Sequence, residues 1–152
     1  MNTNPNYSVN VGSEIGDLEA VIIHTLGSEV ENMTPENAER ALYSDILNLA
    51  VARDEYTQLR GVLRKVTRVY EVKELLAEVM KNEKVRNGLL KNICENCADP
   101  HLMEYLTELD NQHLATAMIE GVTLSRDSLS RFLSEKRFAL PPLHNFFFTR
   151  DA

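Results

Sequence analysis

The chain has 152 residues, 43% of them hydrophobic and 26% charged, a balance typical of a globular domain with one core. Its formal net charge is −7, whereas proteins that bind nucleic acids carry a basic surface. No nucleic-acid partner is therefore expected. No apolar run approaches the roughly 20 residues that span a bilayer, and residues 1–14 lack the basic and apolar segments of a signal peptide. We therefore expect no membrane partner and a cytoplasmic location.

The first part of the chain predicts a strand, then helices, then a second strand. The compact apolar run Ala20–Ile23, bounded by glycines, is typical of a buried strand. A helix is expected after Thr34, a good N-cap that precedes Pro35. Apolar residues then recur at helical spacing from Ile46 to Val66, and Thr67–Val72 alternates as a strand does. This order is βαβ-like and places both strands in one sheet.

The middle of the chain, from Lys73 to about Lys136, predicts helices and no clear strand. Asn, Asp, Gly and Pro residues separate short stretches of helical period. Ser125 is the expected N-cap of the last helix. The expected helical stretches are residues 75–80, 85–93, 102–109, 114–119 and 124–133. We interpret this segment as an inserted all-helical bundle.

The end of the chain returns to an extended pattern. Pro141 and Pro142 stop any helix, because each also disfavours the helical conformation in the residue before it. A strand is expected to begin near Asn145, to contain Phe146–Phe148 and to join the first sheet. The expected class is therefore α/β, with a first unit at 1–72, the helical insertion at 73–138 and a return strand at 139–152.

Two cysteines, Cys94 and Cys97, have the CxxC spacing of some metal and redox sites. A closed zinc site needs four ligands, and His101 supplies only a third. A thioredoxin-like motif follows a strand, whereas the residues before Cys94 predict a helix. The favoured interpretation is two small residues near a helix end with no structural zinc, while the metal and redox alternatives stay open.

Four segments resemble arginine deiminases in order and spacing. They are "SEIGDLEAVIIHTLG", "MTPENAERALYSDI", "HLATAMIEGVT" and "PPLHNFFFTRDA". The resemblance extends from about Ser13 to Ala152, and the family's members are longer by more than half, so the chain is similar to their N-terminal portion. It departs from the family's frequent His-Arg-Pro-Gly after the first strand, where this chain has residues 24–27, His-Thr-Leu-Gly.

The resemblance implies the N-terminal part of a five-bladed α/β propeller, the pentein fold, with an inserted helical bundle. It also implies hydrolysis of L-arginine to L-citrulline and ammonia without metal or cofactor. In the family a cysteine thiolate attacks the guanidinium carbon, a histidine acts as general acid and base, and two carboxylates hold the guanidinium nitrogens. A carboxylate suits this role because it accepts two parallel hydrogen bonds from the planar guanidinium.

Motif matching assigns three site residues. Asp151 matches a guanidinium-binding carboxylate, and Asn145 and Leu42 match residues that contact the amino-acid end of the substrate; Asp45 and Arg150 match positions with supporting roles. The alternatives are a surface charge for Asp151, a strand-entry residue for Asn145 and a core leucine for Leu42.

The family's nucleophile, histidine base and second carboxylate have no match in these 152 residues, and neither Cys94 nor Cys97 matches the nucleophile. We therefore expect the chain alone to be inactive. Three hypotheses remain: a fragment of an arginine deiminase, a naturally truncated relative that acts as an oligomerising binding module, or an unrelated domain with chance motifs. The expected partner for Phe146–Phe148 is a second copy or the remainder of a deiminase chain.

Overall fold

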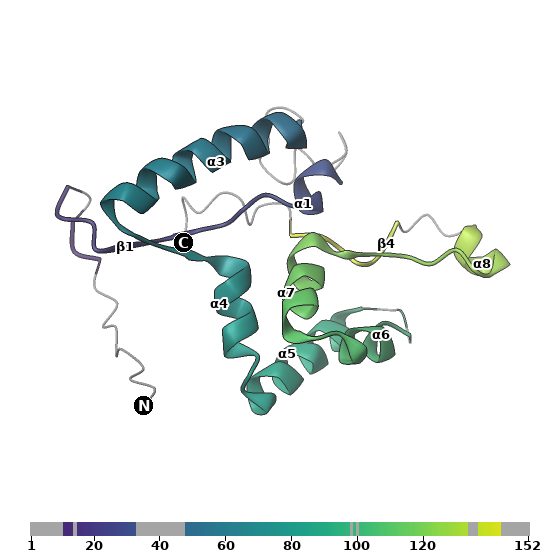
Figure 1. Ribbon diagram of the computed structural model, residues 1–152. Coiled ribbons are helices and arrows are strands. Elements are labelled where there is room, and N and C mark those ends of the chain that lie inside the picture. The colour runs from purple at the N-terminus through teal and green to yellow at the C-terminus, as the bar shows by residue number, and fades with distance from the viewer. Residues whose placement is uncertain are drawn as a thin grey trace.

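The computed structural model describes residues 11–13, 15–32, 48–97, 99, 101–133 and 137–143. Within these ranges the chain is a mixed α/β structure with two small sheets (Figure 1). None of the described helices is long and apolar enough to cross a membrane. The elements in chain order are β1 (Ala20–Ile23), α1 (Ser28–Glu31), α3 (Leu49–Val66), β2 (Arg68–Glu71), α4 (Val72–Val79), α5 (Glu83–Asn96), α6 (Leu102–Glu108), α7 (Asn111–Glu120), β3 (Val122–Thr123), α8 (Leu129–Phe132) and β4 (Phe138–Leu140).

The predicted strand–helix–strand unit is confirmed. β1 and β2 pair in parallel, from Ala20 opposite Arg68 to Ile23 opposite Glu71, and α3 makes the crossover between them. α3 begins after Asn48, whose side chain accepts hydrogen bonds from the backbone N–H groups of Ala50 and Val51. These N–H groups have no partner within the helix, because they belong to its first turn. In the view of Figure 1, α3 runs along one side of β1, and α4 to α7 gather on the other.

The apolar positions of α3 are less covered than a core helix requires. No residue of α3 is buried, and Val51, Leu59 and Val62 each keep half or more of their surface exposed. β1 likewise buries Ile23 but leaves Ile22 54% exposed. The expectation of a buried first strand is therefore met at one end only, because the described part of this sheet has just two strands.

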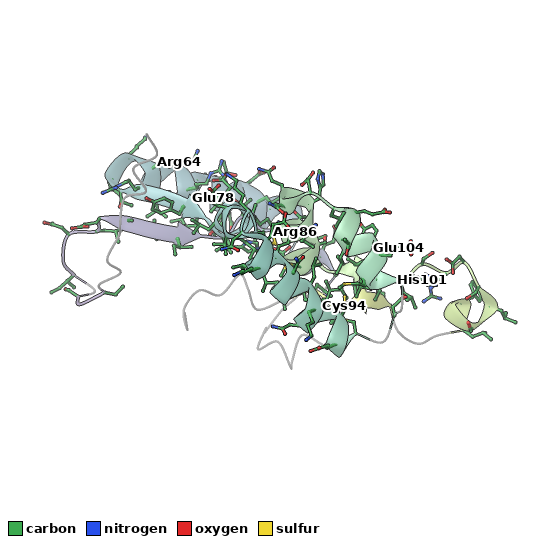
Figure 2. All side chains as sticks on the ribbon, turned by 90° about the horizontal axis from the view of Figure 1, so that it is seen from below. Arg64, Glu78, Arg86, Cys94, His101 and Glu104 are labelled. Carbon is green, nitrogen blue, oxygen red and sulfur yellow. The ribbon has the colours of Figure 1, made fainter. Side chains whose placement is uncertain are left out.

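Helices α4 to α7 pack around a shared hydrophobic core. Asn82 caps α5 and Asp110 caps α7 through side-chain oxygens, which explains why both helices start directly after these residues. Arg86 of α5 donates to the carbonyl oxygens of Thr107 and Leu109 at the end of α6 (Figure 2), and so fastens one helix to the next. The buried core residues are Ala77, Met80, Leu90, Leu102, Leu106, Leu114, Ala115, Ala117 and Leu140.

The expected helix over residues 124–133, with its cap at Ser125, is wrong in its first half. α7 ends at Gly121, whose φ of 81° favours glycine, and the β-branched pair Val122–Thr123 then forms β3. β3 pairs antiparallel with β4, so the expectation of no strand before Lys136 is also wrong. The helix starts only at Leu129, as α8.

The strand expected near Asn145 lies outside the described residues. β4 precedes it and pairs with β3, forming a second sheet separate from β1 and β2. An alanine Cβ at Gly121 would lie 2.8 Å from the carbonyl oxygen of Leu140, so the end of α7 and the end of β4 are in close contact. Leu143 N also donates to the carbonyl oxygen of Ile119 at 2.9 Å. β4 and the residues that follow it, up to Leu143, are thus held against α7.

Candidate functional site

A polar cluster lies at the carboxyl-terminal edge of the β1–β2 sheet. Because the two strands are parallel, both carboxyl ends meet at this edge, which is where α/β sheets place their ligand sites. The segment 24–27 leaves β1 there and leads into α1. We call the side chains that converge on it the strand-end cluster: His24, Thr25, Ser28, Glu29, Tyr56, Arg60, Glu71, Lys73 and Glu120.

The centre of the cluster is a buried pair of His24 and Glu29. His24 Nε2 lies 2.7 Å from Glu29 Oε1, and the two side chains are 1% and 0% exposed. Gly27 N donates to the same oxygen at 2.7 Å. Burial raises the pKa of Glu29, but the hydrogen bonds from His24 and Gly27 outweigh it and lower the pKa below its ordinary value. The carboxylate is therefore held ionised inside the fold.

A second buried carboxylate, Glu71 at the end of β2, holds Thr25. Thr25 donates to Glu71 from its backbone N at 3.1 Å and from its hydroxyl at 2.8 Å. Arg60 of α3 donates to the same carboxylate at 2.9 Å. Charge-assisted hydrogen bonds of this kind fix geometry more firmly than neutral ones, so segment 24–27 is tied to the neighbouring strand and to α3.

α3 supplies two further contacts to the segment. Tyr56 Oη accepts a hydrogen bond from His24 N at 2.9 Å, and Arg53 Nε donates to the carbonyl oxygen of Leu26 at 2.9 Å. Burial of the Tyr56 phenol is the main reason that its pKa is raised, so the hydroxyl stays neutral. Buried backbone groups that no strand pairs are satisfied here by side chains.

Glu120, the last residue of α7, connects that helix to this edge. Its Oε2 accepts from Ser28 N at 3.0 Å and from the Ser28 hydroxyl at 2.8 Å, and its Oε1 pairs with Lys73 of α4. Burial raises the pKa of Glu120, but the hydrogen bonds from Lys73 and Ser28 lower it to below its ordinary value. One carboxylate at the end of α7 thus contacts both α1 and α4.

Gly27 lets the carboxylates come this close. A Cβ at position 27 would lie 2.3 Å from Glu120 Oε1 and 2.4 Å from Glu29 Oε2, closer than real Cβ atoms approach. The backbone of Gly27 is extended, with φ of −123°, so the requirement for glycine is one of space.

The strand-end cluster is suited to positioning the backbone. Its carboxylates accept hydrogen bonds from N–H groups, hydroxyls and cations of the same chain. Across the residues that the structure describes, no group of three or more His, Cys, Asp and Glu side chains is placed to hold a metal ion. The arrangement fixes segment 24–27 and α1 relative to both strands and to α3 and α7.

The site residues predicted from sequence lie elsewhere in the chain. Asp151, Asn145 and Leu42 fall outside the described residues, as do the supporting Asp45 and Arg150. Their roles stay predictions.

Sequence reasoning missed the strand-end cluster. From the sequence, segment 24–27 differs from the family's frequent motif, but nothing predicts a role for it or for Glu120. His24 directly after an apolar strand, with Gly27 and Glu29 close behind, is the one local signal. Glu120 lies 92 residues from Ser28, and no sequence pattern indicated that contact.

Comparison with known proteins gives a consistent family. The sequence model described as "Arginine deiminase" matches residues 39–152. The chain is 32% identical over 158 residues to the arginine deiminase of Pediococcus pentosaceus, an alignment that covers 95% of this chain and 39% of that protein. It is 30% identical over 159 residues to the arginine deiminase of Bacillus cereus (strain B4264), with the same coverage.

A third relative, the arginine deiminase of Lactococcus lactis subsp. lactis, is 32% identical over 163 residues, covering 96% of this chain and 40% of that protein. The chain therefore spans about two fifths of the length of the curated relatives that it matches.

Proposed function

Because the chain belongs to the arginine deiminase family, we propose that it forms the N-terminal portion of an enzyme that hydrolyses L-arginine to L-citrulline and ammonia. The observation that carries the proposal is the family match over residues 39–152, which includes Leu42, Asn145 and Asp151. A cytoplasmic location and the lack of a cofactor belong to the same proposal.

The proposed fold is the first part of a five-bladed α/β propeller with an inserted helical bundle. The parallel β1–α3–β2 unit and the separate core of α4 to α7 support it. We assign residues 1–72 to the first propeller unit, 73–138 to the insertion and 139–152 to the strand that returns to the propeller. The strand-end cluster would then position the first unit against the insertion.

In the proposed reaction, a cysteine thiolate from the remainder of the enzyme forms a bond to the guanidinium carbon. Ammonia leaves with a proton from a histidine, and water then cleaves the carbon–sulfur bond to release citrulline. Asp151 accepts hydrogen bonds from the guanidinium nitrogens, Asn145 holds the amino-acid end of the substrate, and Leu42 packs beside it. Asp151 acts by orienting a planar cation and by stabilising its charge in a site that excludes water.

The first test is a citrulline assay on the purified 152-residue chain. We expect no turnover of L-arginine between about pH 6 and 8, since no residue of this chain matches the nucleophile. Turnover that disappears in Cys94→Ser or Cys97→Ser would overturn the assignment.

The second test reads the DNA beyond codon 152 and expresses everything that the gene encodes. We expect the remaining propeller segments with their cysteine and histidine, and citrulline release that Asp151→Asn lowers by about 100-fold or more. Glu104→Gln, an exposed carboxylate of the insertion, is the matched control and should leave turnover unchanged.

A second candidate is a truncated relative that acts as an oligomerising interaction module. The exposed apolar side chains of α3 favour it, since contiguous apolar surface commonly marks a protein contact. A stop codon directly after codon 152 in the genomic DNA would favour this candidate over the enzyme.

A further inference from the structure

Three sulfur-containing residues lie where α5 ends and α6 begins, away from the strand-end cluster. Cys94 lies on α5 (Figure 2), Cys97 ends that helix, and Met103 lies in the first turn of α6. Cys94 Sγ is 3.3 Å from Met103 Sδ, so thiol and thioether are in contact. Both cysteines are free and half-buried, and Met103 is 42% exposed.

The backbone brings Cys94 and Cys97 close to each other at the end of α5. Cys97 N donates to the carbonyl oxygen of Cys94 at 3.3 Å, which closes a turn. Residues at the two ends of such a turn have Cα atoms within about 7 Å of each other. Burial raises the pKa of Cys94, and the neighbouring Cys97 raises it further.

The ligand chemistry here is soft. Zinc sites combine four Cys, His or carboxylate ligands, and within the described ranges no three such side chains come together to hold a metal. Two thiolates and a thioether are instead the set that selects Cu(I), because soft sulfur ligands match a soft cation. Met103 gives the cluster a ligand that a zinc site does not use.

We propose that Cys94, Cys97 and Met103 bind one soft monovalent metal ion of the Cu(I) class. Each thiol loses its proton to solvent as its sulfur–metal bond forms, the neutral thioether completes the coordination, and no electron is transferred. Three sulfurs at about 2.3 Å from a central ion lie roughly 4 Å apart, so the 3.3 Å contact opens slightly. The flexible, half-exposed Met103 side chain can make that adjustment.

The test is anaerobic titration of the reduced 152-residue chain with Cu(I), in competition with a chromophoric Cu(I) chelator. We expect one Cu(I) per chain. Cys94→Ser and Cys97→Ser should each weaken binding by more than about 100-fold, and Met103→Leu by about tenfold, with far-UV circular dichroism unchanged. Met118→Leu is the matched control, because Met118 packs on the bundle core and should not alter binding.

Four results would overturn the proposal. The first is an absence of Cu(I) binding by the reduced, folded chain. The second is unchanged affinity in Met103→Leu, which would leave a dithiol without a thioether ligand. The third is Zn²⁺ bound at one per chain and not displaced by Cu(I). When diamide oxidises Cys94 and Cys97 to a disulfide, the chain should lose Cu(I) binding. The fourth result is Cu(I) binding that survives this oxidation, which would place the metal on other residues.

Discussion

At the scale of single residues, Gly27 has no room for a side chain. Gly27→Ala places a methyl group against Glu29 and Glu120, and we expect the free energy of unfolding to fall by about 1–3 kcal/mol. Urea denaturation monitored by circular dichroism measures this change. The penalty should shrink in a Glu120→Ala background, because that variant removes one of the two clashing side chains.

Gly61→Ala is the matched control for Gly27→Ala. Gly61 lies in α3, and a Cβ there would meet no atom within 4 Å. We expect this substitution to raise the free energy of unfolding by roughly 0.5–1 kcal/mol, since alanine loses less backbone entropy in a helix. Equal effects of the two substitutions would mean that the contacts at Gly27 do not restrict side-chain size.

The Glu120 carboxylate should make stability depend on pH. Its pKa is lowered in the folded state, below the ordinary value of 4.5, so its contribution is present above that pH and is lost as the pH falls through the folded-state pKa. Glu120→Gln should reduce the free energy of unfolding at pH 7 by about 1–3 kcal/mol. The difference between wild type and variant should narrow below pH 4.5.

Glu78→Gln provides the comparison for Glu120→Gln. Glu78 pairs with Lys81 three residues away, and both side chains are 67% exposed, so solvent screens their interaction. We expect this variant to follow the wild-type pH curve closely. A Glu120→Gln curve parallel to wild type at all pH values would show that Lys73 and Ser28 do not stabilise the carboxylate.

At the scale of elements, α3 depends on its cap more than on a buried face. Asn48→Ala removes the acceptor for Ala50 N and Val51 N, and we expect the local stability of α3 to fall by about 1 kcal/mol. Hydrogen exchange of the first-turn amides measures this loss. Asn48→Asp keeps an acceptor and adds a negative charge near the helix start, so it should retain protection; loss of protection in both variants would contradict a capping role.

Elements with a strong local pattern were predictable, and those set by distant contacts were not. α3, α5 and α7 have helical periods and capping residues within a few positions of their starts, so the sequence predicts them. β3 has only two residues and exists because it pairs with β4 across an intervening segment. The apolar residues of 124–133 recur with the helical period of 3.6, and this pattern predicts a helix there. The pairing of β3 with β4 leaves no such pattern in the sequence.

At the scale of the whole molecule, polar side chains join parts of the described chain that are far apart in the sequence. Ser28 N donates to the Glu120 carboxylate at 3.0 Å, and Arg137 donates to the Asn32 side chain at 3.1 Å. The first hydrogen bond joins residues 92 positions apart in the sequence, and the second joins residues 105 positions apart. No local sequence pattern indicates such pairs. The sequence therefore predicts the order of the elements and the family motifs, but not these contacts between distant segments.

The isolated 152-residue chain is expected to form a dimer in solution. Ile22, Leu59 and Val62 are all at least half exposed, and exposed apolar patches commonly mark protein contacts. Phe146–Phe148, outside the described residues, can each add roughly 150–250 Å² of apolar contact, and an aromatic edge strand pairs readily with a second copy.

Sedimentation at micromolar concentration measures this association, and a two-fold dimer is the simplest assembly. Phe147→Lys should shift the chain to monomer while circular dichroism stays unchanged, because a charge on the contact strand opposes burial. Tyr105→Lys, an aromatic residue of α6 that is 49% exposed, is the matched control and should leave the dimer intact. A wild-type monomer whose Phe146–Phe148 amides are protected from exchange would show instead that the chain folds over its own aromatic strand.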